Sequence, residues 1–404
     1  MIKKILISSC LLLSIVAFSQ EGTSSPYSFY GIGETRFNGN VESRSMGGIS
    51  MIPDSTRINF QNPAGYGNLR LTNFTIAASS SSIKQKSQTS ITTAKRTTLD
   101  YLALAIPLGK FGAGFGLIPY SSVGYKIEEK VTDITNRFSG TGGLSRVFLG
   151  TGYRILPNLS IGATAYYNFG KIQISSLQIK SDVSSASRDL NVNDLNGVNF
   201  NLGLMYQHKM KDKLTLFGSL YYTPKSVLNS INVETIDVVD YNPNYTVTTQ
   251  TDLQMPQKWA LGLGIGDNKK WVVGAEITIQ DAGKLYNIYN TKDNVSYSNN
   301  ERYALGGYFT PSTKPFDSYL KKITYRAGFV YEKSGLIINS TEVKDIGMTL
   351  GFGLPISGSF SNLNLGFEFG KKGTTSNDLV QENYLIINLG FSLNDKWFVK
   401  SKYR

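Results

Sequence analysis

Residues able to carry catalysis or to hold a metal ion are scarce in this chain. His208 is the only histidine and Cys10 the only cysteine. A metal site of the His/Cys type therefore cannot be assembled, and a Ser/His/Asp arrangement would have to use His208. That histidine falls at the end of an expected strand, next to a basic turn, where we expect it to be solvated. We predict a protein without catalytic residues, metal or cofactor, whose function is binding or passage.

Two glycine-rich stretches partly match the sequence pattern of a phosphate-binding loop. LGLGIGDNKK (261–270) lacks the GK[ST] ending and the following helix that such a loop needs. GFGLPISG (351–358) is the same kind of partial match. Both stretches are predicted to be a strand followed by a turn, so neither supplies a nucleotide site.

The first 19 residues have the form of a secretory signal peptide. Lys3 and Lys4 make the charged start, residues 5–16 are mostly apolar, and residues 17–19 place small side chains at −3 and −1 of a cleavage site before Gln20. The alternative, a membrane anchor, is disfavoured because the apolar run is shorter than a membrane span and no basic patch follows it. Cleavage would leave a mature chain without cysteine, which relies on burial and hydrogen bonds rather than on disulfides.

The chain carries a net charge of +12, from 41 basic and 29 acidic residues. Its lysines gather in short turns, at Lys110, 209–213, 269–270, 321–322 and 396–400. Basic turns at one end of a barrel suit an anionic membrane surface, and they are equally compatible with ordinary solvated turns. Because the charge is not concentrated along one helix, we predict membrane lipid and not nucleic acid as a partner.

From Leu71 onward, apolar and polar residues alternate with the period of two that marks a half-buried strand. In 362–370, for example, the apolar face is formed by Leu363, Leu365, Phe367 and Phe369. We count about fourteen such runs, most of them long enough to cross a bilayer as tilted strands. They lie near 71–83, 97–109, 111–121, 143–156, 158–173, 196–209, 213–224, 257–267, 270–280, 301–310, 321–333, 345–355, 361–371 and 383–393.

The connections between these runs alternate in length. Lys110 and 210–212 are short, whereas 122–142 and 225–256 are long and polar. Short turns at one end and long loops at the other are typical of an outer-membrane barrel. We therefore predict an all-β fold, a transmembrane antiparallel β-barrel of about 14 strands over 71–404, multi-pass in the bacterial outer membrane. An even strand number places both ends of the wall at the short-turn, periplasmic side, from which the N-terminal part would enter the lumen.

A short polar stretch, SRSMGGISMIPDSTRINFQNPAGYG (43–67), precedes the strands. We predict that it folds back inside the barrel as a hatch, and that 20–42 contributes no strand of its own. Several strands also carry glycines on one face: Gly112, Gly114 and Gly116; Gly150 and Gly152; Gly262, Gly264 and Gly266; and Gly351 and Gly353. If they point inward they leave room for the insert; the alternative is that they relieve curvature at barrel bends.

Four charged residues fall on the expected lumen face of the wall, namely Arg154, Glu276, Arg326 and Glu368. A charge inside a barrel is either paired structurally, often with the plug, or lines a permeation path. We favour the structural pairing.

The stretch GGISMIPDSTRINFQNPAGYGNL (47–69) resembles the N-terminal hatch of FadL-type outer-membrane transport proteins. The paired small residues are Gly47 and Gly48, the acidic residue is Asp54, and the small turn before the first strand is Asn62, Pro63, Ala64 and Gly65. LQMPQKWALGLG (253–264), followed by KWVVGAEITIQD (270–281), is similar to the family's proline-containing entry to a central hairpin.

After the signal peptide at 1–19, this resemblance implies an N-terminal segment and luminal hatch at 20–70 and a fourteen-stranded barrel at 71–404. It implies passive transport of long-chain fatty acids or other hydrophobic small molecules, with a lateral opening at a kinked third strand. Gly112, Gly114, Gly116 and Pro119 are the candidates for that kink, since glycine loosens a strand and proline removes a ladder hydrogen bond.

Three hypotheses follow for the function. A transporter predicts an apolar pocket between hatch and wall and a gap near Pro119. Some relatives resembling the family act instead as barrel partners in protein secretion, as in the type IX translocon; a non-transporting partner of such a secretion or envelope complex predicts a filled lumen and an ordered surface on 225–256. A barrel enzyme would have to depend on His208, and we do not expect it.

Overall fold

The computed structural model describes residues 22–210, 213–239, 241–281, 294–314 and 316–397. Its strands form one antiparallel sheet. They are β1 (Glu34–Thr35), β2 (Thr72–Lys86), β3 (Ile91–Leu108), β4 (Phe111–Pro119), β5 (Ser121–Val131), β6 (Ile134–Leu156), β7 (Leu159–Lys180), β8 (Ser187–Lys209), β9 (Thr215–Thr223), β10 (Ser226–Val238), β11 (Tyr241–Met255), β12 (Lys258–Asp267), β13 (Trp271–Gln280), β14 (Val295–Tyr297), β15 (Asn300–Phe309), β16 (Thr324–Ile338), β17 (Thr341–Pro355), β18 (Asn362–Lys372) and β19 (Gln381–Asp395). The short helical elements are η1 (Pro26–Phe29), α2 (Val41–Arg44), η2 (Pro63–Asn68), α3 (Tyr319–Lys322) and η4 (Ser376–Asp378).

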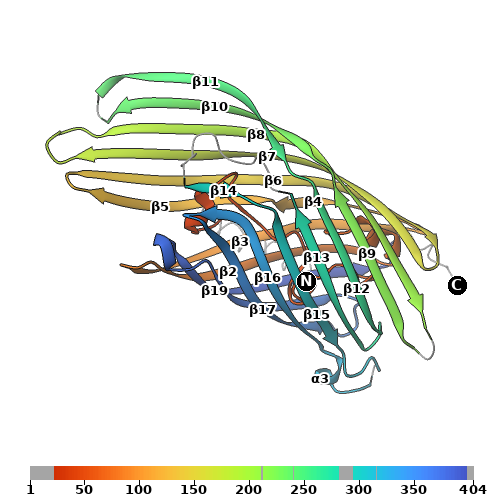
Figure 1. Cartoon of the computed structure of the whole chain (residues 1–404). Coiled ribbons are helices and arrows are strands. Elements are labelled where there is room, and N and C mark those ends of the chain that lie inside the picture. The colour runs from red at the N-terminus through yellow and green to blue at the C-terminus, as the bar shows by residue number, and fades with distance from the viewer. Residues whose placement is uncertain (1–21, 211–212, 240, 282–293, 315, 398–404) are drawn as a thin grey trace, which may run out of the picture.

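The sheet closes into a barrel of 14 wall strands, as the sequence predicted (Figure 1). Closure comes from the last strand, β19, which pairs with the first wall strand, β2, from Gln381 opposite Lys86 to Asp395 opposite Thr72. Four wall strands consist of two pieces in line: β4 with β5, β9 with β10, β11 with β12, and β14 with β15. Most wall strands have a neighbour on each side over most of their length, the exceptions being residues 91–101 of β3 and all of β11, each of which pairs on one side only within the described residues. Where both neighbours are present, the wall satisfies its backbone groups without water.

Side chains point alternately outward and inward along the wall strands, and the apolar ones point outward, which is the reverse of the arrangement in a soluble protein. In β12, Trp259, Leu261 and Leu263 point outward and are 44%, 55% and 59% exposed, whereas Ala260 points inward and is 2% exposed. The outward face of β8 is likewise apolar, with Phe200 52% exposed. An apolar exterior around a barrel with small or polar inward residues is what a bilayer requires.

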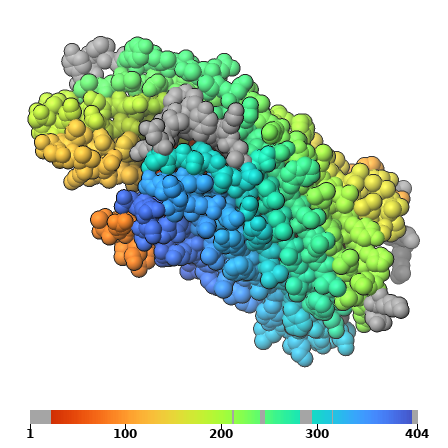
Figure 2. Space-filling view, in the orientation of Figure 1, coloured from red at the N-terminus to blue at the C-terminus, as the bar shows by residue number. Residues whose placement is uncertain are grey.

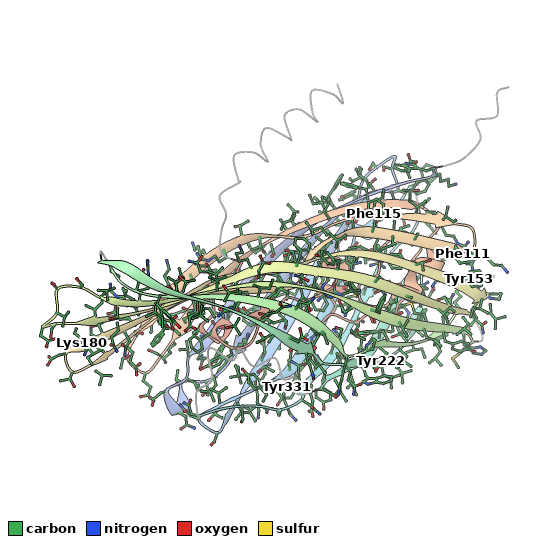
Figure 3. The ribbon with its side chains drawn as sticks, turned by 90° about the horizontal axis from the view of Figure 1, so that it is seen from above. Phe111, Phe115, Tyr153, Lys180, Tyr222 and Tyr331 are labelled. Atoms are coloured by element: carbon green, nitrogen blue, oxygen red, sulfur yellow. The ribbon has the colours of Figure 1, made fainter. Side chains whose placement is uncertain are left out.

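Aromatic residues mark two levels of this exterior. At the short-turn end, the rings of Phe111 and Tyr153 lie 4.4 Å apart. Nearer the other end, those of Tyr222 and Trp259 lie 3.9 Å apart. Figure 3 shows Phe111 and Tyr153 together at the end of the barrel opposite Lys180, which lies near the tip of a long hairpin. Two aromatic girdles of this kind are typical of membrane barrels, where they lie at the interfaces.

The polar stretches expected to be loops at the long-connection end are strands instead. β5 and β6 turn at 132–133, β7 and β8 pair out to Gln178 opposite Ser187, and β10 and β11 form one long hairpin over 226–255. Figures 1 and 2 show these hairpins projecting together beyond the rest of the barrel. Strand pairing needs only backbone hydrogen bonds, so polar residues that are wet on both faces can extend a sheet that the membrane wall has already started.

Among the described residues, none of the helices is long and apolar enough to cross a membrane. The packed interior is formed largely between the N-terminal segment and the wall. In one cluster, Ile58, Phe60 and Tyr66 of that segment pack with Tyr101 and Phe148 of the wall.

Candidate functional site

The N-terminal segment, residues 22–71, contacts the inner face of the barrel at both of its ends. At the long-hairpin end, Ser25 Oγ donates a hydrogen bond to Glu382 Oε2 (2.9 Å), and Gln85 Nε2 donates one to the Ser24 carbonyl (2.6 Å). At the short-turn end the segment leads into β2 at Thr72. The prediction that the N-terminal segment enters from the short-turn side is therefore wrong. Its first described residues lie at the long-hairpin end, and the segment crosses the lumen before it joins the wall at β2.

The expectation that 20–42 carries no strand is also wrong. Glu34 and Thr35 form β1, which pairs antiparallel with Ser122 and Ser121 of β5. Next to it, the backbone N–H of Arg36 donates to the carbonyl of Tyr120 (2.8 Å). The period-two signal could not reveal a strand of two residues.

The predicted hatch turn lies against the wall at η2. Asn62 caps this turn, since its Oδ1 accepts from the backbone N–H of Ala64 (3.1 Å). Its Nδ2 donates to the carbonyls of Leu204 (3.1 Å) and Leu220 (3.2 Å), on two neighbouring wall strands. Pro63 follows at the first position of the turn, where a missing N–H costs nothing.

Inward-facing glycines form the surface on which η2 lies. A Cβ on Gly112 would be 2.0 Å from the Tyr66 carbonyl oxygen, and one on Gly114 would be 2.5 Å from the Tyr66 ring. A Cβ on Gly162 would meet the Pro63 carbonyl at 2.3 Å, and one on Gly203 would meet the Asn62 side chain at 2.1 Å. These glycines therefore make room for the insert.

The paired glycines of the predicted hatch lie against β15 and β16. Gly47 and Gly48 have φ of +69° and +86°, which side chains other than glycine rarely adopt. The backbone N–H of Gly47 donates to Thr349 Oγ1 (2.9 Å), and its carbonyl accepts from Arg302 Nη2 (2.7 Å). A Cβ on Gly47 would be 2.9 Å from the carbonyl of Leu305, so the close approach requires glycine.

Asp54, the acidic residue of the hatch pattern, organises its own turn. Its Oδ1 accepts from the backbone N–H and the hydroxyl of Thr56, both at 2.7 Å, and its Oδ2 accepts from Arg57 Nε at 2.7 Å. Burial by itself would raise the pKa of Asp54. The charge of Arg57 and these hydrogen bonds outweigh burial and hold that pKa below its usual value.

Two of the predicted lumen charges bind the N-terminal segment directly. Glu276, 2% exposed, accepts at Oε2 from the backbone N–H and the hydroxyl of Ser50, both at 2.7 Å. Glu368 Oε1 lies 2.5 Å from Arg44 Nε. Both residues therefore act as wall anchors for the insert.

The other two lumen charges lie toward the short-turn end. Arg326 is 8% exposed, and its Nη1 donates to Asn364 Oδ1 (3.2 Å). Asn364 in turn donates to Glu42 Oε1 (3.0 Å), so this arginine reaches the insert through one amide. Arg154 is half-buried near the turn between β6 and β7, and its backbone N–H donates to the Lys110 carbonyl (2.9 Å).

The barrel wall is interrupted in its third strand, directly after Pro119. Up to that point β4 pairs with β3, the last pair being Leu117 opposite Leu102. Beyond Tyr120 the strand continues as β5, which pairs with β6 and β1 but not with β3. Residues 91–101 of β3 therefore pair only on the β2 side, within the described part of the chain. We call this separation of β3 from β5 the wall break.

The four predicted kink residues lie in three different surroundings. Gly112 and Gly114 lie under Tyr66, and Gly116 packs against the backbone of β3, where a Cβ would be 2.3 Å from the Leu102 carbonyl oxygen. Only Pro119 adjoins the wall break.

A cavity of about 510 Å³ lies behind the wall break, between the N-terminal segment and the wall. Its lining is mixed rather than apolar and includes Tyr30, Arg36, Thr98, Asp100, Tyr120 and Arg146. Arg146 is 5% exposed and is sandwiched by two rings, with its guanidinium carbon 3.6 Å from the Tyr120 ring centre and 4.8 Å from that of Tyr166. Neither its Nε nor its Nη2 has a hydrogen-bond partner among the described residues.

Sequence reasoning missed Arg36, Asp100 and Arg146. Asp100 sits between two arginines of the insert, Arg36 Nη1 at 3.7 Å and Arg44 Nη1 at 3.4 Å. The parity of the strands could have placed Arg146 on the inward face, together with Phe148. Nothing in the sequence pairs positions 36 and 100, because that contact depends on the path of the insert.

His208 lies at the end of β8, as expected, with its ring stacked on Tyr206 at a centroid distance of 6.4 Å. Within the described ranges, no group of three or more His, Cys, Asp or Glu residues is arranged to hold a metal ion.

These features define the class of protein: a transmembrane β-barrel with its own N-terminal segment packed against the inside of a wall that is broken in the third strand. A family model described as BamG matches residues 1–404, and the chain belongs to the BamG family. Comparison with curated protein sequences finds no match.

Solved structures of similar fold include the toluene transporter TodX of Pseudomonas putida, with 17% identity over 90% of this chain and 99% of that one, and a TM-score of 0.59. The toluene transporter TbuX of Ralstonia pickettii has 14% identity over 89% and 100%, with a TM-score of 0.59. A Pseudomonas aeruginosa FadL homologue has 11% identity over 90% and 100%, again with a TM-score of 0.59. At such identities the likeness establishes the fold, and the predicted resemblance to FadL-type barrels is confirmed at that level.

Proposed function

We propose that this protein is a multi-pass barrel of the bacterial outer membrane that passively transports long-chain fatty acids or other hydrophobic small molecules. In this proposal residues 1–19 are the signal peptide, 20–70 the N-terminal segment and hatch, and 71–404 the barrel. The observation that carries it is the wall break, which adjoins a cavity inside the barrel. Barrels of the same fold that are described as toluene transporters support it.

The level of the wall break favours exchange with the outer leaflet. On β7 the outward face changes from Tyr167 and Phe169, which are aromatic, to Lys171, whose side chain is 62% exposed. Phe169 pairs with Ser145, which in turn pairs with Pro119. The break therefore lies at the aromatic girdle of the long-hairpin end, which we assign to the external side.

The mixed lining of the cavity favours amphipathic over purely hydrocarbon substrates. Within the described part of the chain, Arg146 Nε and Nη2 have no hydrogen-bond partner, and a buried guanidinium prefers an anionic or strongly polar partner. The aromatic side chains of Tyr120, Tyr166 and Tyr221 line the same cavity and supply apolar surface for an alkyl chain. A fatty acid combines both kinds of group.

The first test is native mass spectrometry of the detergent-purified protein, with extraction and identification of bound small molecules. We expect fatty acids or other apolar compounds to be released from the wild type. The matched variant Thr278→Trp, which fills the cavity from β13, should release less, and Thr249→Trp on the exposed β11 should behave as the wild type. Equal recovery from all three proteins, or none from the wild type, would count against transport.

A second candidate function, a barrel partner in a secretion (type IX-like) or envelope complex, is favoured by one observation. The stretch 225–256, predicted as the docking surface for that hypothesis, is an ordered hairpin that projects from the barrel, with Tyr245 66% exposed. Shortening the hairpin by residues 230–251 removes the paired tip and leaves the base at Ser226 and Met255. If this candidate holds, the wild type co-purifies with a stoichiometric partner protein and the shortened variant does not, while bound lipid is absent from both.

A further inference from the structure

The N-terminal segment follows the free edge of β5 at the wall break. β1 pairs with Ser121 and Ser122, and Ser121 Oγ donates to the Ile32 carbonyl (2.8 Å). Further along, the backbone N–H of Gly124 donates to Ser28 Oγ (3.1 Å). Residues 28–36 therefore occupy the edge of β5 that faces the wall break.

The side chain of Arg36 spans from β5 to β3. Its Nε donates to Ser122 Oγ (2.9 Å) on β5, and its Nη1 donates to Thr98 Oγ1 (2.9 Å) on β3. The same Nη1 lies 3.7 Å from Asp100 Oδ1, and Nη2 donates to the Gly22 carbonyl. One guanidinium thus joins two wall strands that do not pair with each other.

The close fit of this segment depends on glycine. Gly33 has a φ of +89°, and a Cβ placed on it would lie 2.5 Å from the Ser122 carbonyl oxygen and 2.6 Å from a methyl group of Val123. Val123 is 2% exposed in this arrangement.

We propose that β1 and Arg36 form a latch that closes the wall break, and that release of this latch is the step that opens the cavity laterally. The inference rests on the proposed function for its role in transport. The physical basis is that β1 occupies the β5 edge through backbone bonds, while the Arg36 side chain ties that edge to Thr98 and Asp100 of β3. Opening of the break therefore requires β1 to leave the β5 edge. A planar guanidinium can serve both strands at once, but a lysine ammonium is a single point donor.

The latch itself is tested without any transported molecule. The described residues contain no cysteine, so Val123→Cys is a single reporter in an otherwise unreactive wall. In the purified protein this thiol should react slowly with a maleimide. Adding Arg36→Ala should raise the reaction rate about tenfold or more, since the variant loses charge-assisted hydrogen bonds that hold the segment closed. Arg36→Lys should give an intermediate rate.

The control is Arg137→Ala, which removes an arginine paired at 2.8 Å with the exposed Glu128 on the same hairpin. It should leave the labelling rate unchanged. Gly33→Ala, which leaves Arg36 intact but obstructs its strand, should raise the rate as Arg36→Ala does. If Val123→Cys stays unreactive in both variants while the barrel remains folded, β1 is a fixed part of the wall and the latch proposal fails.

The transport role is tested by locking the latch. Thr35 and Ser121 are opposed register partners, a placement that suits a disulfide between cysteines at those positions. Oxidised Thr35→Cys/Ser121→Cys protein should lose oleate uptake and regain it on reduction. Undiminished uptake in the oxidised protein would overturn the role in transport. If no protein takes up oleate, wild type included, the proposed function fails, and the labelling rates still decide whether the latch exists.

Discussion

The ring of Tyr66 lies directly over Gly114: a Cβ on that glycine would be 2.5 Å from the ring carbon Cε1. Tyr66 of the insert and Gly114 of the wall, which are 48 residues apart in sequence, are thus complementary in shape. The glycine provides the space that the ring occupies. Gly150, on the neighbouring strand, makes the same room for the other edge of the ring, 2.6 Å from Cε2.

This relationship predicts that Gly114→Val displaces the hatch turn without preventing barrel formation. Overpacking of this kind destabilises by about 1–3 kcal/mol. We expect it to destabilise the packing of the insert and to leave the hydrogen bonds between the strands intact. Limited proteolysis should cut residues 55–70 in the variant and not in the wild type. Gly218→Val is the matched control, because the Cβ at that strand position meets nothing closer than 3.9 Å. Equal protection in both variants would show that η2 does not depend on this contact.

Asn62→Ala should loosen the hatch turn by removing three hydrogen bonds at once. The expected loss is about 1–3 kcal/mol, because the carbonyls of Leu204 and Leu220 lose a buried donor and Ala64 loses its cap. Hydrogen exchange of the amides of 64–68 should accelerate. Asn229→Ala, which replaces an exposed asparagine on β10, should leave exchange in 64–68 unchanged. An unaltered rate in Asn62→Ala would mean that the turn is held by packing alone.

Asp54→Asn should destabilise the insert, because it leaves the Arg57 guanidinium without its carboxylate in a largely buried place. Breaking such a pair costs up to about 3–5 kcal/mol when fully buried, and less here because the Asp54 side chain keeps 23% exposure. The readout is the urea midpoint of a fluorophore attached to the insert. Glu128→Gln, at an exposed pair, is the control and should not shift the midpoint. If the urea midpoint of Asp54→Asn equals that of the wild type, the Asp54–Arg57 pair does not stabilise the insert.

Deleting residues 47–65 should leave a barrel that inserts but leaks. The wall ladders close without the insert, since β19 pairs with β2 directly. Conductance in planar bilayers should rise above that of the wild type, and heat-modifiable migration should show a folded barrel. Failure of the deleted protein to assemble would make the insert a folding element. Unchanged conductance would place the closure of the lumen elsewhere.

Sequence reasoning succeeded where a repeated local pattern reports the fold. Alternation such as that of β12 marks which side chains face lipid, so closure of the barrel and the strand number could be predicted. It failed where pairing has no apolar signature. The Thr- and Asn-rich hairpin of β10 and β11 was expected to be a loop because neither face needs to be apolar outside a membrane.

The site was predictable only in part, for a related reason. Glycine faces such as Gly112 and Gly114 could be noticed in the sequence, but their partner Tyr66 depends on the path of the insert. Arg36 bridges β3 and β5 only because β1 places it there, and a two-residue strand leaves no periodic signal. Contacts made by a single traverse of the lumen are therefore beyond a pattern-based prediction.

The most direct test of the central claim is the uptake of radiolabelled oleate by cells that carry either the wild type or Thr278→Trp in their outer membrane. Thr278 is 7% exposed and lines the cavity. Thr249→Trp, on the exposed β11, is the matched control, and folded barrel in the membrane is quantified for all three. We predict that Thr278→Trp loses most of the uptake and that Thr249→Trp keeps it. Uptake by Thr278→Trp equal to that of the wild type would contradict passage through the cavity.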